Sequence, residues 1–223
     1  VKGFAEKSFF EYHLYTLGRP TTLPDNSTKQ IELFNPVKSV PVDKLLVYAG
    51  VPSQFYYYSH PVTDSSIGQP VTNVDVYLQF PNSEKRGMGM PLPAGRIRVS
   101  KMDTADGSLE FIGEDVIKHT PKNEKVLVKL GKAFDVVGER KQVDFHVDSS
   151  RKTMSETIEI KIRNHKKEPV NVTVQERLYR WVNWKILENS SSWNKEDSRT
   201  IHFPVSVAPD GEAVVTYTVK YTW

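Results

Sequence analysis

The sequence contains no cysteine among its 223 residues. This absence excludes disulfide bonds, thiolate zinc sites and a cysteine nucleophile. It does not fix the compartment, because cysteine-free chains fit both the reducing cytosol and the oxidising periplasm.

The sequence also lacks long apolar runs and a marked excess of charge. No segment approaches the roughly 18 to 20 apolar residues of a membrane-spanning helix. Thirty Lys and Arg residues stand against 27 Asp and Glu residues, which gives a formal net charge of +3. We therefore expect no nucleic-acid partner and no membrane span in these residues. Because the chain starts at Val1 and not at methionine, we expect it to be a piece of a longer protein whose signal peptide, if it has one, lies upstream.

Common catalytic motifs are missing as well. The six histidines form no HExxH motif, and the sequence has neither a GxSxG nucleophile elbow nor a GxxxxGK[ST] phosphate loop. We therefore predict that the chain is not an enzyme and that it binds no cofactor.

What the sequence does contain is an alternation of apolar and polar residues over most of its length. Side chains on a β-strand point to opposite faces in turn, so this period of two predicts strands with one face on a core. No window shows the i, i+3, i+4, i+7 apolar stripe of a helix. The clearest apolar sets are Val74/Val76/Leu78/Phe80, Val126/Val128/Leu130, Ile158/Ile160/Ile162, Val170/Val172/Val174, Ile201/Phe203/Val205/Val207 and Tyr217/Val219/Tyr221/Trp223.

Turn sequences separate these predicted strands. "TADGS" at 104–108 is a hairpin signature, and "NHKKEP" at 164–169 and "APDGE" at 208–212 join later strands. Isolated hairpins are unstable in water, so the strands must stack into sheets. The fold class predicted is all-β with two β-sandwich-like domains. Residues 1–137 form an irregular sandwich, and residues 138–223, with roughly six strands, form an immunoglobulin- or fibronectin-like sandwich.

Several segments together resemble a known bacterial family. They are "PLPAGRIRV", "LEFIGEDVIKHTPKNEKVLVKLGKAFDVVGER", "RLYRWVNWKI" and "VTYTVKYTW". This combination resembles a domain of unknown function that forms the C-terminal half of proteins related to a mucoidy inhibitor. The resemblance covers most of the chain, from about residue 28 to the end. It implies a β-sandwich module, often found in secreted or envelope proteins, without established enzymatic activity and without binding residues that could be carried over.

The densely charged stretch 91–145 can be mistaken for an active site. Its acidic and basic residues include Glu114, Asp115 and His119, which lie around one predicted strand. An acid–base site needs burial and a partner for the titrating group, and neither is visible here. We interpret the charges of this stretch as the solvent-facing sides and turns of strands.

One row of residues has the composition of a metal site. Asp144, His146 and Asp148 are spaced at i, i+2, i+4, so all three project from one face of a strand. Carboxylate and imidazole groups ligate divalent metals. The solvent-facing side of any amphipathic strand gives the same pattern, and we do not predict a metal site from it.

Aromatic residues supply the remaining candidates for binding. Tyr179, Arg180, Trp181 and Trp184 lie within six positions, and Tyr56, Tyr57 and Tyr58 are consecutive. Exposed aromatic rings with polar neighbours stack on sugars, peptides or bases. The alternative is that one tryptophan fills the core and the other stacks on a neighbouring domain.

Two hypotheses for the function follow. The first is a non-enzymatic β-sandwich module that binds a protein partner, or other domains of the same longer chain, in the periplasm or at the cell surface. The second is a carbohydrate-binding module that uses the Trp and Tyr clusters. The envelope location follows from the family resemblance alone, and the residues themselves fit a cytoplasmic protein equally well.

Overall fold

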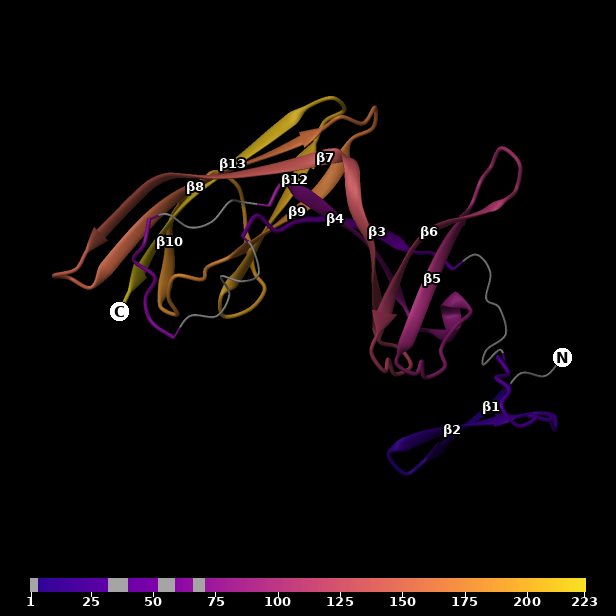
Figure 1. The fold of residues 1–223 in the computed structure, drawn as a ribbon. Helices are drawn as coiled ribbons and strands as arrows, with labels where there is room; N and C mark the ends of the chain where they lie inside the picture. The colour runs from indigo at the N-terminus through magenta and orange to yellow at the C-terminus, as the bar shows by residue number, and fades with distance from the viewer. Residues whose placement is uncertain (1–3, 32–39, 52–58, 66–70) are drawn as a thin grey trace. The chain divides into compact units, whose positions relative to one another are not determined.

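The chain forms an all-β structure, confirming the predicted class. The computed structural model describes residues 4–31, 40–51, 59–65 and 71–223. In these residues the regular elements are β-strands and one short 3-10 turn, η2 (Glu84–Arg86) (Figure 1). None of the described residues belongs to a helix with the length and hydropathy needed to cross a membrane.

The chain divides into two compact units, and each of them is discontinuous in sequence. Unit 1 comprises residues 1–43 and 78–128, and unit 2 comprises residues 44–77 and 129–223. Three strands run from one range into the other: β3 (Asp43–Tyr48), β4 (Asn73–Pro81) and β7 (Lys125–Asp148). The predicted division at 137/138 differs from this grouping, because it falls inside β7 and places β3 with the N-terminal residues.

Unit 2 is built on most of a nine-stranded sheet. Its strand order is β10-β13-β8-β7-β4-β3-β9-β12-β11. Besides the three strands already given, the sheet contains β8 (Thr153–Asn164), β9 (Val170–Arg177), β10 (Trp184–Asn189), β11 (Asn194–Lys195), β12 (Thr200–Val207) and β13 (Glu212–Thr222). The pair β3–β9 is parallel, whereas β8 pairs antiparallel with both β7 and β13.

The core of unit 2 lies between strands that are not neighbours in the sheet. Strand β12 contacts β13 and β8 although the other strands of the sheet separate them, so the sheet turns back over its own apolar face. The Phe203 ring on β12 lies 5.4 Å from the Tyr217 ring on β13, measured between ring centroids. The predicted inward sets Ile158/Ile160/Ile162 and Val170/Val172/Val174 are buried in this core, which confirms the phase of the alternation.

One glycine of unit 2 is required because a buried aromatic ring lies against the backbone of its strand. A Cβ atom added to Gly138 on β7 would lie 2.1 Å from Cε2 of Tyr48 on β3. The Tyr48 ring therefore lies directly against the β7 backbone, and its hydroxyl donates a hydrogen bond of 2.7 Å to the carbonyl of Val71. A glycine inside a strand pattern commonly marks such an approach.

Unit 1 has a much smaller apolar interior. Its described residues include two hairpins, β1 (Phe4–Phe9) with β2 (Tyr12–Leu17) and β5 (Gly95–Met102) with β6 (Leu109–Ile117). The buried apolar side chains in this described part are Ile117, Val126 and Val128. Hydrogen bonds of a buried polar side chain stabilise this unit in addition to its small apolar core. The side chain of Asn82 donates to the carbonyls of Met90 and Pro121 and accepts from the Gly89 amide.

Candidate functional site

Two of the residues selected from the sequence as ligand-binding candidates are buried in unit 2. Tyr179 is 2% exposed and Arg180 is 0% exposed. The guanidinium of Arg180 donates from Nε to Glu156 Oε2 at 2.8 Å and from Nη1 to the carbonyls of Val62 and Asp64, each at 2.9 Å. Arg180 thus fixes the chain at 62–64 to the core, so the prediction that it lines an exposed binding surface is wrong. Burial removes the water that would otherwise solvate a charge, so a buried charge needs fixed hydrogen-bonding partners of this kind.

A second buried ion pair lies in the same unit. Arg140 Nε on β7 donates to both carboxylate oxygens of Glu176 on β9, at 3.1 and 3.0 Å. The hydroxyl of Tyr217 donates to the same carboxylate. Burial lowers the pKa of Arg140, but the negative charge of Glu176 more than offsets this and holds the pKa well above its usual value.

The buried tyrosines titrate far from their ordinary range. Burial, followed by the negative charge of Glu176, raises the pKa of Tyr217, and burial together with the charge of Glu156 raises the pKa of Tyr221. Tyr48 and Tyr179 have pKa values raised for the same principal reason, burial. The phenols therefore stay neutral at physiological pH. Tyr217 and Tyr221 donate hydrogen bonds to the carboxylates of Glu176 and Glu156, whereas Tyr48 donates to the backbone carbonyl of Val71.

Sequence reasoning missed both ion pairs, although the sequence carries a signal for them. Glu156 is in phase with Ile158 and Ile160, and Glu176 is in phase with Val172 and Val174. A charged residue at an inward position of a strand predicts a buried charge with a partner. The partners, Arg140 and Arg180, come from other segments and could not be assigned from local pattern.

The tryptophans pack against the core of unit 2 and form no flat platform. Trp181 is half-buried, and its ring nitrogen has no hydrogen-bond partner among the described residues. Trp184 on β10 packs edge-on to Trp193, with ring centroids 6.1 Å apart and planes at 61°. The Trp184 nitrogen donates to the Ser198 carbonyl at 2.8 Å, and Lys195 Nζ lies 5.1 Å from the centroid of its ring. Trp193, which sequence reasoning did not select, completes this cluster.

The other sequence candidates do not form a site in the described residues. Tyr56, Tyr57 and Tyr58 lie outside them. Asp144, His146 and Asp148 do project from one strand face, but the described part of the chain contains no group of three metal-ligating side chains close enough to hold an ion. Asp148 instead accepts hydrogen bonds from Ser150 and from the Arg151 amide, which lower the pKa of its carboxyl.

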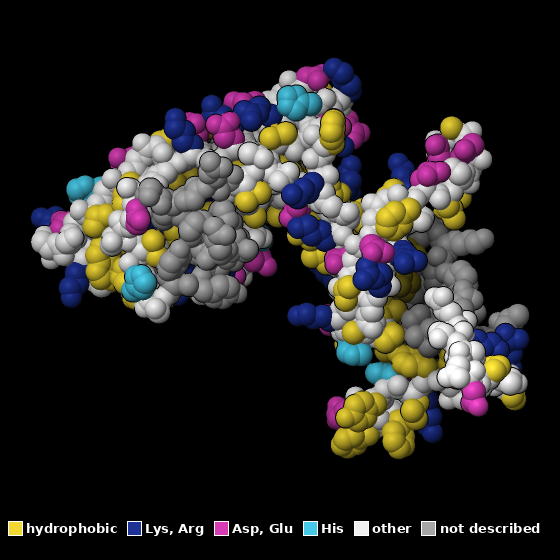
Figure 2. All heavy atoms as spheres, in the orientation of Figure 1, with side chains coloured by type: hydrophobic (Ala, Val, Ile, Leu, Met, Phe, Trp, Pro, Cys, Tyr) yellow, Lys and Arg dark blue, Asp and Glu magenta, His cyan; other side chains and the backbone are white. Residues whose placement is uncertain are grey.

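An exposed surface rich in apolar side chains lies on the β5–β6 hairpin of unit 1, here called the ribbon. Alternating residues of β5 and their partners on β6 share one side, which we call the outer face. Figure 2 shows hydrophobic side chains at the surface of this ribbon. The outer face consists of Arg96, Arg98, Ser100 and Met102 on β5 with Leu109, Phe111, Glu114 and Val116 on β6.

The apolar residues of the outer face are highly exposed. The exposed fractions are 60% for Met102, 68% for Leu109, 60% for Phe111 and 63% for Val116. Single exposed apolar residues are common on protein surfaces, but a contiguous patch marks an interaction site. The opposite side of the ribbon includes buried Ile117, so the alternation places one side on unit 1 and leaves the outer face uncovered.

The two ends of the ribbon differ in their charged residues. Near its base, Glu114 pairs with the guanidiniums of both Arg96 and Arg98. The far end is the predicted hairpin turn, where Asp103 and Asp106 accept hydrogen bonds from the amides of Ala105 and Ser108. These side-chain bonds to the backbone hold the turn, which extends beyond the rest of unit 1 (Figure 1).

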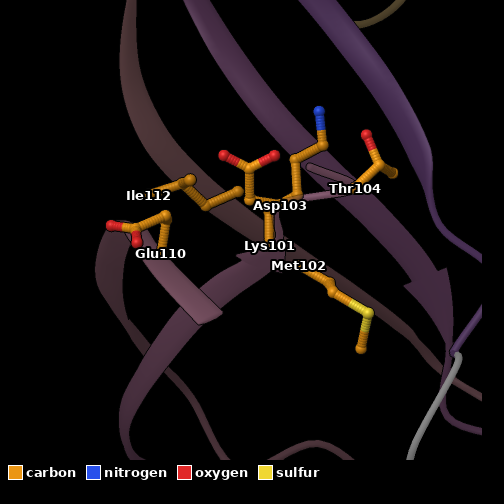
Figure 3. A pocket seen from close by; sticks show the side chains of 6 residues that line it. All are labelled: Lys101, Met102, Asp103, Thr104, Glu110 and Ile112. Carbon is orange, nitrogen blue, oxygen red and sulfur yellow. The ribbon is translucent and has the colours of Figure 1, made fainter. Parts of the chain in front are cut away.

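A shallow hollow of about 240 Å³ lies at the same end of the ribbon. Figure 3 shows its lining, which comes from both strands and the turn: Lys101, Met102, Asp103, Thr104, Glu110 and Ile112. The volume is below the roughly 300 Å³ at which ligand pockets begin. Its mixed apolar and charged lining fits contact with a protein side chain better than enclosure of a small molecule.

Comparison with known proteins adds no assignment. No family model, no curated protein and no solved structure matches this chain.

Proposed function

We propose that the chain is a non-enzymatic interaction module, in which unit 2 is a stable support and the ribbon of unit 1 binds a protein. The observation that carries this proposal is the exposure of Met102, Leu109, Phe111 and Val116 on one face of a two-stranded sheet. A two-stranded ribbon with an uncovered apolar face is marginal in water, and a bound partner would supply the missing layer.

In this proposal the module consists of two β-sandwich-like domains, of which the C-terminal one is immunoglobulin-like. The module belongs to the family of mucoidy-inhibitor-related C-terminal domains, and it lies in the periplasm or at the cell surface. The contacts of β12 with β13 and β8 across the core support the sandwich. The outer face supports an interaction role, with either a separate protein or another domain of a longer chain as the partner.

The β1–β2 hairpin offers a second apolar surface in unit 1. Phe9 and Tyr12 are cross-strand partners on one face, and Leu14 lies on the same face. Phe10 is in the two-residue turn with a φ of 56°, a conformation that bulky side chains rarely adopt, and its ring is exposed. Strained and exposed aromatic residues at a hairpin tip favour binding over a structural role.

Carbohydrate binding, the alternative hypothesis, has less support from the geometry. Sugar platforms need an accessible ring face, whereas Tyr179 is buried and the ammonium group of Lys195 lies over the Trp184 ring. All four tryptophans of the chain lie in unit 2. If carbohydrate binding were the function, a panel of polysaccharides would change their fluorescence, and we expect no change.

Site-specific photo-crosslinking tests the proposed function. A photoreactive amino acid replaces Phe111 in one variant and Val214, an exposed apolar residue of β13, in a control variant. Both variants are irradiated in cells that naturally produce the chain. We expect protein adducts through position 111 and few through position 214. Equal adducts at both positions, or none at position 111, would overturn the proposal.

A further inference from the structure

Both cations of the outer face are arginines, and they share one counter-ion. Arg98 on β5 is the cross-strand partner of Glu114 on β6, and Arg96 lies diagonally opposite the same residue. The guanidinium of Arg98 donates from Nε to Glu114 Oε2 at 3.2 Å, and Arg96 donates from Nη1 to Glu114 Oε1. Because two positive charges face one carboxylate, the base of the outer face keeps a net positive charge.

Glu114 orients the two guanidiniums without covering them. The side chains of Arg96 and Arg98 are 56% and 75% exposed. Among the described residues, Glu114 is the only hydrogen-bonding partner of the Arg98 side chain, and it engages Nε alone. The two Nη groups of Arg98 are thus available to a partner, and such a fork of N–H donors binds a carboxylate through two parallel hydrogen bonds.

The other charged side chains of the ribbon do not belong to the outer face. Lys101, Glu110 and Asp115 are on the opposite side, where Lys101 and Glu110 are cross-strand partners. Asp103 and Asp106 belong to the turn between the two strands. The charge that the outer face itself presents to a partner is therefore that of the arginine pair, reduced by Glu114.

Apolar side chains continue from the arginines along the outer face. Phe111 lies opposite Ser100, two residues along β5 from Arg98, and Leu109 lies opposite Met102, four residues along. At about 3.3 Å per residue, these apolar side chains follow Arg98 at about 7 and about 13 Å. Arginine, methionine and aromatic residues are enriched in protein interfaces, whereas lysine and the acids are depleted there.

We propose that the outer face binds an extended protein segment in which an acidic side chain lies beside apolar side chains. The carboxylate binds the Nη groups of Arg98, next to Arg96, and the apolar side chains pack on Phe111, Leu109 and Met102. This inference rests on the proposed function, because it gives the chemistry of the protein that covers the outer face.

The spacing of the outer face defines the sequence of such a segment. In an extended chain, alternate side chains point to the same side and follow one another at about 7 Å. An acid over Arg98 therefore places the second residue along the segment over Phe111 and the fourth over Leu109. The matching segment has Asp or Glu at one position and apolar residues at the second and fourth positions from it.

The acids of the turn favour a protein segment over a lipid surface. Arginines and apolar side chains together also suit an anionic bilayer. The turn with Asp103 and Asp106 extends beyond the rest of unit 1, however, directly next to the apolar residues (Figure 1). Hydrogen bonds from Ser108 lower the pKa of the Asp106 carboxyl, so this acid is ionised at neutral pH. An anionic bilayer would repel this turn, whereas a segment that carries its acid over Arg98 keeps it at the other end of the ribbon.

Peptide display tests the inference. Random dodecapeptides on phage are selected on the wild-type chain and, in parallel, on the Phe111→Ser variant. We expect the wild type alone to enrich peptides with Asp or Glu and with apolar residues at the second and fourth positions from it. The inference is overturned by enriched peptides without such an acid, by the same peptides from both selections, or by no enrichment at all.

A double-mutant cycle then shows whether the acid meets the arginines. Fluorescence anisotropy gives the Kd of an enriched peptide, and of its variant with an amide in place of the acid, for the wild type and for Arg96→Gln/Arg98→Gln. Each change alone should weaken binding by about tenfold, and both together should weaken it no further. Losses that multiply would place the acid elsewhere and overturn the inference.

Two exposed lysines of unit 2 provide the matched control for charge. Lys185 on β10 and Lys220 on β13 are cross-strand partners, as closely spaced as the arginine pair. Lys185→Gln/Lys220→Gln should leave the Kd of the peptide within about threefold of the wild-type value, because these cations lie outside the ribbon. Circular dichroism verifies that each variant is folded. A loss equal to that of the arginine variant would show a nonspecific effect of net charge and overturn the inference.

Vesicle flotation tests the lipid surface directly. Vesicles of phosphatidylcholine and phosphatidylserine are mixed with the wild type and with Arg96→Gln/Arg98→Gln. We expect neither chain to float with the vesicles. Flotation of the wild type that is lost in the arginine variant would identify anionic lipid as the occupant of the outer face and overturn the inference.

The crosslinking at position 111 separates this inference from the proposed function. A protein adduct whose crosslinked segment contains Asp or Glu at the expected spacing supports both. Protein adducts at position 111, combined with selected peptides that lack the acid, overturn the inference and leave the interaction role standing. The absence of any adduct at position 111 overturns the interaction role itself.

Discussion

Arg180 and Glu156 form an ion pair that is almost completely removed from water. The guanidinium Nε lies 2.8 Å from the carboxylate, and the side chains are 0% and 1% exposed. The carboxylate also accepts a hydrogen bond from Tyr221, and the guanidinium lies 4.2 Å from the centre of the Phe145 ring. Buried charges of this kind are costly to separate but contribute little beyond what an apolar pair would.

Breaking this pair should therefore destabilise unit 2 strongly. We expect Glu156→Gln to lower the free energy of unfolding by about 3–5 kcal/mol, because it leaves the Arg180 charge buried without its counter-ion. The double variant Glu156→Gln/Arg180→Met should recover part of that loss. Urea unfolding followed by tryptophan fluorescence measures both values in unit 2.

An exposed ion pair provides the control for this measurement. Arg151 lies 3.6 Å from Asp148 and its side chain is 83% exposed. Arg151→Met should change stability by less than about 1 kcal/mol. If Glu156→Gln were as mild as Arg151→Met, the buried pair would not hold the core as described.

Replacing Gly138 by alanine should also be destabilising, for a steric reason. The added Cβ would meet Cε2 and Cδ2 of Tyr48 at 2.1 and 2.2 Å, so the buried Tyr48 ring or the β7 backbone must move. Overpacking of this kind costs about 1–3 kcal/mol or more. Gly95→Ala is the matched control, because its Cβ would meet no atom within 4 Å, and thermal unfolding of both variants should separate them clearly.

Stability should fall at alkaline pH because of the buried tyrosines. Burial raises the pKa values of Tyr48, Tyr179, Tyr217 and Tyr221 in the folded chain. In the unfolded chain each phenol loses its proton near pH 10, so the stabilisation is fully present below that pH and is lost as the pH rises above it. The expected slope is about 1.4 kcal/mol per pH unit for each tyrosine that is protonated only in the folded state.

Tyrosinate absorbance near 295 nm follows this titration directly. One group of tyrosines should ionise in the folded chain, and the buried group only together with unfolding. A single smooth titration of all ten tyrosines near pH 10, with the fold intact, would contradict the burial of these phenols.

Removal of the end of β13 should prevent folding of unit 2. Strand β13 lies between β10 and β8, and Val219 and Tyr221 are 0% exposed. Deletion of residues 218–223 therefore removes core side chains and leaves backbone groups of both neighbouring strands unpaired. Cooperative unfolding of the truncated chain at a temperature close to that of the full chain would disprove this. Deletion of Trp223 alone, which is only half-buried, is the milder control.

The sequence predicted the strands well because alternation is a local property. The inward sets at 158–162, 170–174 and 201–207 are the core of unit 2, and "TADGS" is the turn of the ribbon. Strand pairing is not local: nothing in the pattern shows that β3 pairs with β9, more than 120 positions further along the chain. The grouping of residues 44–77 with 129–223 depends on such pairings and could not be read from composition.

The candidate site was harder to predict than the fold. Aromatic clustering drew attention to Tyr179 and Trp184, but clustering does not distinguish a binding platform from a core, and here the core accounts for them. The residues of the outer face, such as Phe111 and Val116, look in the sequence like ordinary members of amphipathic strands. Only the structure shows that their face is uncovered.

The free energy of unfolding of the Phe111→Ser variant tests the central claim most directly, namely that the apolar residues of the ribbon serve binding and not the core. Far-ultraviolet circular dichroism follows urea unfolding at a concentration where the chain is a single copy. Because Phe111 is 60% exposed, we expect a change within about 0.5 kcal/mol. A loss of about 3–5 kcal/mol, as expected for Phe203→Ala in the core, would show that Phe111 is a core residue and would contradict the account.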